Sequence, residues 1–450
     1  MTEMDATTAD ILASLRTGVV PPAGLGLFAV GLERLTGAIQ QELEELRRSP
    51  GQGRAKWIRG EYGSGKTFAS RLIGDVARAQ GFATAEAQVS INDTPLHHLE
   101  TVYRRLIERL TTAADGSGAL QAIVDAWLYQ LGEQVTALQG LAEDDPTFAA
   151  AVDKRLEERL ALISSRNAAF AQVLRAYHQA IQQEDYRTAQ GLLAWLGGQP
   201  HIDRSVLSKA GVKGSVDGQA ALTFLRGLLL LLQQTGYAGL VVVLDEVETI
   251  QRMPGPTREK ALNALRQLVD ALASGELPGM YLLVTGTPDF FDGYKGLKGL
   301  QPLLQRVSTR FEDDARFDNL RAPQVRLPAF DRERLLRVGQ RVRELFTQGS
   351  DERVARAVDD AFLRGMVEEI TRGFGGKISV CPRIFLRELV DVLDRVDQHP
   401  DYDPRGRYQL RVDEAELRPQ ELAARRGEDP EDAEGEVPAV APPTPRRLDG

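Results

Sequence analysis

Hydrophobic residues recur along the chain with two spacings, and each spacing predicts a different element. Between residues 31 and 48, leucine and isoleucine return every three or four positions, which predicts an amphipathic helix. Continuous apolar runs, of which VVVL at 241–244 is the clearest, are typical of strands in a parallel sheet covered on both faces. Further strands are expected at 56–60, 82–90, 281–291 and 324–330. Strands that alternate with helices predict an α/β fold.

Two long helical patterns set the predicted domain organisation. One runs from about 96 to 200, between neighbouring strands, and predicts an inserted helical subdomain. The other follows the last strand and predicts a C-terminal helical lid. The predicted parts are an N-terminal helical segment (1–50), an α/β core with the insertion (51–330), the lid (331–400) and a polar tail expected to be disordered (401–450).

Composition narrows the class of protein. The 450 residues are 42% hydrophobic and 26% charged, which is ordinary for a globular protein. The net charge of −9 argues against a surface coated all over with nucleic acid. The single cysteine, Cys381, favours a reducing compartment. The N-terminus lacks the pattern of a signal peptide, and the longest apolar run (228–232) is far shorter than the roughly twenty residues of a membrane span. We therefore expect a cytoplasmic protein without a membrane partner.

The stretch GEYGSGKT fits the phosphate-loop spacing G-x-x-x-x-G-K-[ST] without a mismatch. Its glycines let the backbone amides turn toward a phosphate, Lys66 can reach between the β- and γ-phosphates, and the Thr67 hydroxyl can ligate Mg²⁺. A glycine-rich turn with a chance lysine is the alternative, but the strand before it and the helix after it disfavour that interpretation. The residues expected to bind nucleotide are Gly60, Glu61, Tyr62, Gly63, Ser64, Gly65, Lys66, Thr67 and Phe68.

A pair of acids ends the most apolar strand. Asp245 is expected to hold Mg²⁺, and Glu246 to polarise the attacking water. A core strand that happens to end in acids is the competing interpretation, which the preceding phosphate loop disfavours. The adjacent glutamate favours hydrolysis over binding alone. The chain has no N-K-x-D motif for reading guanine, which favours ATP over GTP.

Polar residues further along the chain complete the predicted catalytic set. Thr285 ends a later strand and can sense the γ-phosphate or orient water, although a plain strand-to-turn transition explains it equally well. Arg306 and Arg310 are expected one helical turn apart, and Arg383 near the start of a late helix. An arginine can stabilise charge on the transferred phosphoryl group, whereas a solvated surface role is commoner for any single one. Arg383 is the preferred candidate.

The order of these motifs resembles that of AAA+ ATPases, within them most closely the Orc/Cdc6-like and STAND branches. The stretches IRGEYGSGKTF, LDEVETIQRM, GTPDFF and PRIFLREL are similar to the ATP-binding proteins of BREX phage-defence systems, of the BrxD type. The resemblance implies a P-loop, AAA+-like core, ATP and Mg²⁺ as cofactors, and a bacterial antiviral role. It also implies a superfamily-2 DNA helicase as a companion.

Three functions follow as hypotheses. The first is an Mg²⁺-dependent ATPase of a DNA-directed defence complex, acting as a homo-oligomer or beside a helicase. The second is a STAND-like nucleotide-gated switch or scaffold with slow turnover. The third is a DNA-binding subunit, for which the locally basic stretches 251–260 and 294–310 are candidates, against the ordinary interpretation of a solvated face.

Overall fold

The computed structural model describes residues 3–348 and 352–428, whose contacts divide them into two compact units. The sheet unit comprises residues 31–60 and 65–328. The helical unit comprises residues 3–30, 61–64 and the described residues from 329 onward. Residues 31–50, expected with the N-terminal segment, thus group with the sheet, and the tip of the phosphate loop groups with the C-terminal helices.

A five-stranded sheet in the order β2-β3-β4-β1-β5, with every neighbouring pair parallel, forms the centre of the sheet unit. The predicted α/β fold with a parallel sheet is therefore confirmed, and the order is typical of P-loop ATPases. Strand β3 ends at Asp245, and after Glu246 the chain enters a 3₁₀ helix, η2 (Val247–Arg252). The strands are β1 (Arg54–Arg59), β2 (Ala83–Gln88), β3 (Leu240–Asp245), β4 (Met280–Gly286) and β5 (Gln324–Arg326).

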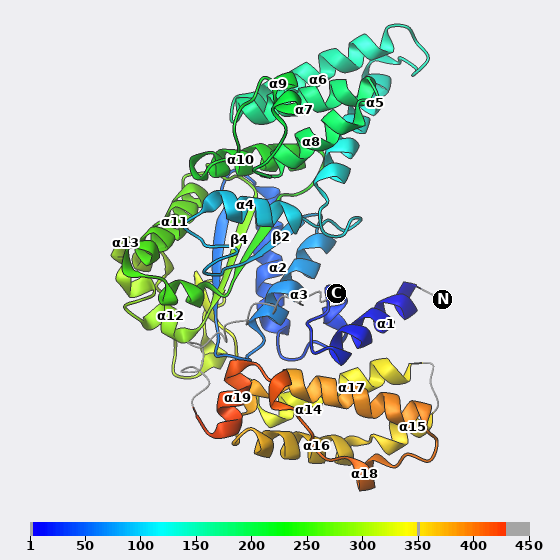
Figure 1. Ribbon diagram of the computed structural model, residues 1–450, viewed down its shortest axis with the longest axis vertical. Helices are drawn as coiled ribbons and strands as arrows, with labels where there is room; N and C mark the ends of the chain where they lie inside the picture. Colours follow the sequence, from blue (N-terminus) through cyan, green and yellow to red (C-terminus); the bar gives the residue numbers. More distant parts are fainter. Residues whose placement is uncertain (1–2, 349–351, 429–450) are drawn as a thin grey trace, which may run out of the picture. The chain divides into compact units, whose positions relative to one another are not determined.

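Helices cover both faces of this sheet (Figure 1). One face packs against α3 (Lys66–Ala79), with α2 (Glu33–Arg48) beside it. On the other face, α4 (Leu99–Glu108), α10 (Gly218–Gln234) and α11 (Gly255–Ala273) enclose Val242 and Leu244 of β3. Every residue of β3 and β4 is buried, which explains their continuous rather than alternating hydrophobic pattern.

The predicted helical insertion lies between α4 and α10, and its helices pack on one another in chain order (Figure 1). The rings of Tyr103, Phe170 and Trp195 meet Phe224 of α10 edge-on, with centroids 5.5–5.8 Å apart. The insertion therefore shares one hydrophobic core with the sheet. Its helices are α5 (Leu120–Gln139), α6 (Phe148–Ser164), α7 (Ala168–Gln182), α8 (Tyr186–Leu196) and α9 (Arg204–Lys209).

Among the described residues of both units, no helix is long and apolar enough to cross a membrane.

The rest of the sheet unit connects β3, β4 and β5. The connecting elements are η2, α12 (Pro288–Asp292), η3 (Leu297–Gly299), α13 (Gln301–Val307) and η4 (Ala315–Phe317).

A buried ion pair anchors the strand that leads to the phosphate loop. Lys56 of β1 donates from Nζ to Glu42 Oε1 at 2.6 Å and to the carbonyl oxygens of Leu320 and Ala322 at 2.9 and 2.8 Å. Tyr281 of β4 donates to the other oxygen of Glu42 at 2.7 Å. Burial, reinforced by the Glu42 charge, holds the pKa of Tyr281 well above its usual value, so the phenol stays a donor.

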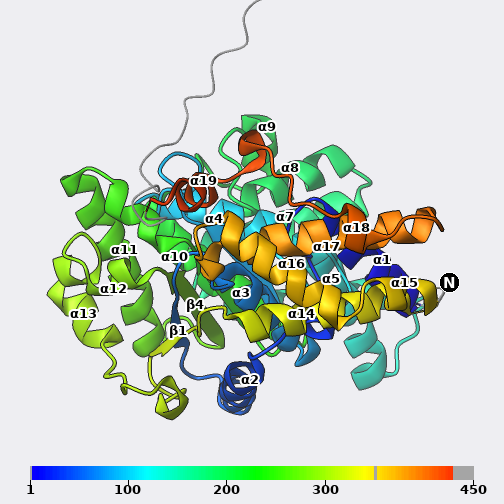
Figure 2. The ribbon, with the colours of Figure 1, turned by 90° about the horizontal axis from the view of Figure 1, so that it is seen from below.

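The helical unit is a bundle in which α14, α16 and α17 pack against one another and α1 packs on α17 (Figure 2). Gly339 of α14 lets Phe385 of α17 approach: a Cβ there would lie 2.7 Å from the phenylalanine ring. The unit contains α1 (Glu3–Arg16), η1 (Leu25–Leu27), α14 (Arg332–Thr347), α15 (Glu352–Ala357), α16 (Asp360–Gly373), η5 (Ile378–Val380) and α17 (Pro382–Gln398).

The segment after residue 400 departs from the expected disordered tail. Residues up to 428 form α18 (Pro404–Arg407), η6 (Glu414–Glu416) and α19 (Pro419–Arg426). Although polar in sequence, α19 buries Ala423, Ala424 and the Glu421 carboxylate, whose charge is paired by Arg383. A polar helix is thus stabilised by an ion pair that its local sequence does not reveal. The remaining tail, 429–450, lies outside the described residues.

Candidate nucleotide-binding site

The phosphate-loop sequence begins and ends at fixed points of the sheet unit. Gly60 follows β1, and its amide donates to the Gly286 carbonyl oxygen of β4 at 3.1 Å. At the other end Gly65 caps α3 with φ +89°, a left-handed conformation that costs glycine little and other residues considerably more. The chain therefore turns from a central strand directly into a helix whose positive end faces the loop.

The phosphate-loop lysine, Lys66, is buried and donates a hydrogen bond to its own loop. Lys66 Nζ donates to the Gly60 carbonyl oxygen at 2.9 Å and lies 3.7 Å from Glu248 Oε1. The buried Glu248 carboxylate is thus an internal counter-ion for the lysine. Glu248 is not among the predicted site residues, and its only signal in the sequence is a second acid two positions after Glu246 in DEVE.

Asp245 is the point at which the loop helix and two strands meet. Its Oδ2 accepts a hydrogen bond from Thr67 Oγ1 at 2.7 Å, and its Oδ1 accepts one from Thr285 Oγ1 and one from the Glu246 amide at 3.1 Å. The parallel register, in which Leu244 pairs with Val284, sets Thr285 beside Asp245. The structure therefore brings together four predicted residues: Lys66, Thr67, Asp245 and Thr285. The Thr285 hydroxyl is hydrogen-bonded to the Asp245 carboxylate.

Glu246 has a strained backbone and a bonded carboxylate. Its φ of +60° lies in the left-handed region, where residues other than glycine are uncommon and often functional. Its Oε2 accepts a hydrogen bond from Gln88 Nε2 at 2.7 Å. Gln88 ends β2 and pairs in register with Asp245. Sequence reasoning missed Gln88, although a polar residue closing an otherwise small and apolar strand was a usable signal.

The chemistry of these groups fits a magnesium-bound triphosphate. A threonine hydroxyl and an aspartate carboxylate on the same edge are the hard oxygen ligands that Mg²⁺ prefers. Lys66 supplies a positive charge at the same edge. In the loop itself, the buried Ser64 hydroxyl has no hydrogen-bond partner among the described residues, as expected of a donor suited to a phosphate oxygen.

The tip of the loop, Glu61–Ser64, is part of the helical unit. Gly63 has φ +72°, and a Cβ at this position would lie 1.8 Å from the Ser379 carbonyl oxygen of η5. Burial raises the pKa of the Tyr62 phenol, and the Glu421 carboxylate raises it further. Phe68 lies in the first turn of α3 and is partly buried.

Two of the predicted arginines, Arg306 and Arg383, are ion-paired within their own units. Arg306 of α13 contacts Asp270 of α11, with Nε 2.5 Å from Oδ1. Helix α13 ends at Val307, so Arg310 lies beyond it and the predicted spacing of one helical turn is wrong: Ser308 and Thr309 leave the helical conformation. Arg383 of α17 pairs with Glu421.

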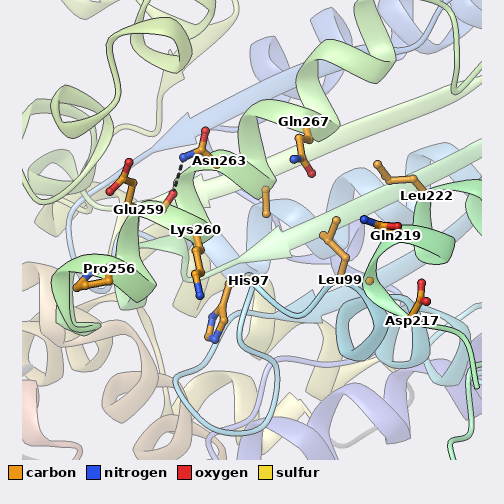
Figure 3. A pocket seen from close by; sticks show the side chains of 12 residues that line it. His97, Leu99, Asp217, Gln219, Leu222, Pro256, Glu259, Lys260, Asn263 and Gln267 are labelled. Carbon is orange, nitrogen blue, oxygen red and sulfur yellow. Dashed lines mark hydrogen bonds between the residues drawn. The ribbon is translucent and has the colours of Figure 1, made fainter.

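A groove of about 1000 Å³ lies beside the loops that leave the site (Figure 3). One wall comes from His97 and Leu99, which follow β2, and from the first turn of α10. The α11 wall carries Lys260, which points toward His97 in Figure 3. Burial is the main cause that lowers the pKa of His97, and the charges of His98 and Lys260 lower it further. His97 lies in the loop that follows β2, which ends at Gln88, and α11 follows η2, which begins after Glu246.

Comparison with known families agrees with this geometry. The model of a family described as BREX system ATP-binding protein BrxC/D matches residues 4–412. The chain therefore belongs to that family, and it is an ATP-binding component of the BREX phage-defence system. Comparisons with curated proteins and with solved structures give no significant match.

Proposed function

We propose that this BREX ATP-binding protein is an Mg²⁺-dependent ATPase that acts on DNA beside a helicase subunit, in the cytoplasm. The observation that carries the proposal is the hydrogen bond between Thr67 and Asp245, 2.7 Å long, at the sheet edge where Lys66 is also held. A triphosphate bound there has a cation for its phosphates and two oxygen ligands for its metal.

The residues divide the chemistry between them. Thr67 and Asp245 would hold the metal, which would supply positive charge to stabilise the phosphates. Lys66 exchanges the Gly60 carbonyl oxygen for phosphate oxygens. Glu246 accepts a proton from the attacking water, while Gln88 orients its carboxylate through the 2.7 Å hydrogen bond. A charged acceptor and a donor in fixed geometry support hydrolysis over binding alone.

A phosphate-release assay tests this enzyme function. We expect Mg²⁺-dependent release by the wild type, loss of ATP binding in Lys66→Ala, and retained binding with at least a hundredfold slower release in Glu246→Gln, because general-base catalysis contributes roughly 10²–10⁴-fold. Lys154→Ala, at an exposed position of the insertion, is the matched control. No release by the wild type with or without DNA, together with loss of binding in Lys66→Ala, refutes the enzyme but leaves a nucleotide-binding protein.

Action on DNA is tested by the same assay with single- and double-stranded DNA and with a superfamily-2 helicase of the kind that the resemblance implies. Phosphate contacts predict that DNA affinity falls steeply with salt. The exposed Lys298, which lies 5.9 Å from the centroid of the exposed Tyr294 ring, and the neighbouring Lys295 are the first positions for charge reversal. DNA affinity that is independent of both salt and these two lysines refutes direct binding through this segment.

A nucleotide-gated switch is the second candidate. It is favoured by the inclusion of loop residues Glu61–Ser64 in the helical unit, since a nucleotide on the loop then acts directly on that unit. Slow release insensitive to DNA, with Glu246→Gln accumulating in one stable partner-bound form, supports the switch. Rapid DNA-stimulated turnover excludes it as the main function.

A further inference from the structure

The segment between α12 and α13, residues 293–300, is a loop of the sheet unit with a glycine at every third position (Figure 1). A Cβ on Gly296 would lie 1.9 Å from the Phe290 carbonyl oxygen, and one on Gly299 would lie 2.6 Å from the Tyr294 carbonyl oxygen. Gly299 also donates its amide to the Gly296 carbonyl oxygen at 3.0 Å. The backbone of the loop is therefore packed closely on itself, and it holds its outward side chains in place.

This loop presents one aromatic ring and two ammonium groups to solvent. Tyr294 is 83% exposed, more than any other large hydrophobic side chain among the residues that the structure describes. Lys298 Nζ lies 5.9 Å from the centre of the Tyr294 ring, and Lys295 is the residue that follows Tyr294. Both lysines are exposed, and neither forms an ion pair within residues 3–348 and 352–428.

The acids of the same segment do not cancel the charge of these lysines. Asp292 pairs with Arg59 of β1, and Asp289 accepts a hydrogen bond from Gln251. From residue 293 to residue 311 the chain contains no acid at all. The loop therefore carries two positive charges that no acid of its own segment compensates.

A single ring beside lysines matches a nucleic-acid strand better than a protein surface. Stable protein interfaces bury about 800 Å² on each partner around an apolar centre. Tyr294 has no such surroundings within its loop, because Leu297 is fully buried and the exposed neighbours of the ring are lysines. A DNA strand needs only an aromatic face for a base and cations for the flanking phosphates.

We propose that this loop is a binding site for single-stranded DNA, in which a base stacks on Tyr294 while Lys295 and Lys298 contact phosphates. The inference rests on the proposed action on DNA and names its substrate. The strand must be single, because neighbouring bases cover the base faces inside a duplex, whereas a separated strand can offer a face to the ring. The packed loop fixes the ring before the strand arrives, so little conformational entropy is lost on binding.

Replacement of the ring tests the stacking. We expect Tyr294→Ala to weaken binding of an oligothymidine strand of about 20 nucleotides by roughly tenfold, because one stacked base contributes about that much to affinity. Tyr294→Phe keeps the ring and should stay within about twofold of the wild type. Tyr129→Ala, which removes a tyrosine that is 67% exposed on α5, is the matched control and should change nothing.

Affinities are measured by fluorescence anisotropy with the labelled strand and with a duplex of the same length. The wild type should bind the duplex about tenfold more weakly, since no base face is open to Tyr294. Salt dependence then separates stacking from charge, because each phosphate contact to a single strand contributes about 0.7 to the slope of log affinity against log salt. We expect Lys295→Ala/Lys298→Ala to reduce this slope by about 1.4 and Tyr294→Ala to leave it unchanged. If Tyr294 only held the lysines in place, its removal would reduce the slope as well.

Four outcomes would overturn the inference. They are Tyr294→Ala affinity within about twofold of the wild type, equal losses in Tyr294→Ala and Tyr129→Ala, equal binding of strand and duplex, and equal displacement of the strand by polyglutamate and by unlabelled oligothymidine. The last would indicate an acidic protein partner. The failure of the proposed function looks different: a wild type that binds neither strand nor duplex at low salt removes action on DNA altogether. Salt-dependent binding that needs neither Tyr294 nor the two lysines removes only this site.

Discussion

Lys56 provides a test of how the phosphate-loop strand is held. The substitution Lys56→Met keeps the aliphatic stem but removes the ammonium group, which makes one ion pair and two hydrogen bonds to carbonyl oxygens. Glu42 is then left with a single donor, the Tyr281 phenol. Because the side chains of the pair are 2% and 12% exposed, water cannot replace the lost partner.

The magnitude follows from this burial. Removing one partner of a buried ion pair costs about 3–5 kcal/mol, since it leaves an uncompensated charge in the interior. Arg54, two residues earlier on the same strand, pairs with Glu45 in solvent, where the side chains are 39% and 57% exposed. Loss of such a surface pair costs about 0–1 kcal/mol. Arg54→Met is therefore a matched control on the same strand.

Urea unfolding followed by tryptophan fluorescence measures the difference, because all three tryptophans, Trp57, Trp127 and Trp195, lie in the sheet unit. We expect Lys56→Met to lower the free energy of unfolding by about 3–5 kcal/mol. The double variant Lys56→Met/Glu42→Leu should regain part of that loss, because no buried charge remains but the Tyr281 phenol loses its acceptor. A Lys56→Met variant within about 1 kcal/mol of Arg54→Met would refute the reasoning.

Three further predictions concern the loop, the thiol and the glutamate. Gly63→Ala should weaken ATP binding at least tenfold, because the added Cβ would lie 1.8 Å from a carbonyl oxygen. Gly81→Ala is the control: Gly81 has a similar φ (+84°) but no neighbour within 4 Å, so ATP affinity should stay within twofold of the wild type. Equal effects of the two substitutions would contradict this. Burial raises the pKa of the Cys381 thiol to about 12, so Ellman's reagent at pH 8 should label it only after unfolding; rapid labelling of the native protein contradicts the burial. Gln88→Ala should slow phosphate release about tenfold with ATP affinity within twofold, since it frees the Glu246 carboxylate; unchanged release would mean that this hydrogen bond does not orient the base.

Local patterns predicted most of the sheet and the centre of the site. The phosphate loop is recognisable because an apolar strand precedes it and a helix follows it. Asp245 is recognisable because it ends an apolar strand and is followed by a second acid. The parallel sheet follows from strands without polar alternation. These features depend on residues within about one element of each other.

What the sequence could not predict depends on register and on distant contacts. Gln88 meets Glu246 only because β2 and β3 are neighbours in register, 158 positions apart in the chain. The Arg383–Glu421 pair joins residues 38 positions apart and stabilises a polar helix that buries only one face. No periodicity in the sequence indicates that Arg383 and Glu421 are paired, since each lies among other charged residues.

The metal dependence of ATP binding tests the central claim most directly: Lys66 and Asp245 serve one Mg²⁺-bound triphosphate. Affinity is measured in Mg²⁺ and in EDTA for the wild type, Lys66→Ala and Asp245→Asn. We expect the wild type to bind at least tenfold more tightly in Mg²⁺, Asp245→Asn to bind equally in both, and Lys66→Ala to bind in neither. An Asp245→Asn variant that keeps the full gain from Mg²⁺ would contradict the assignment of this carboxylate to the metal.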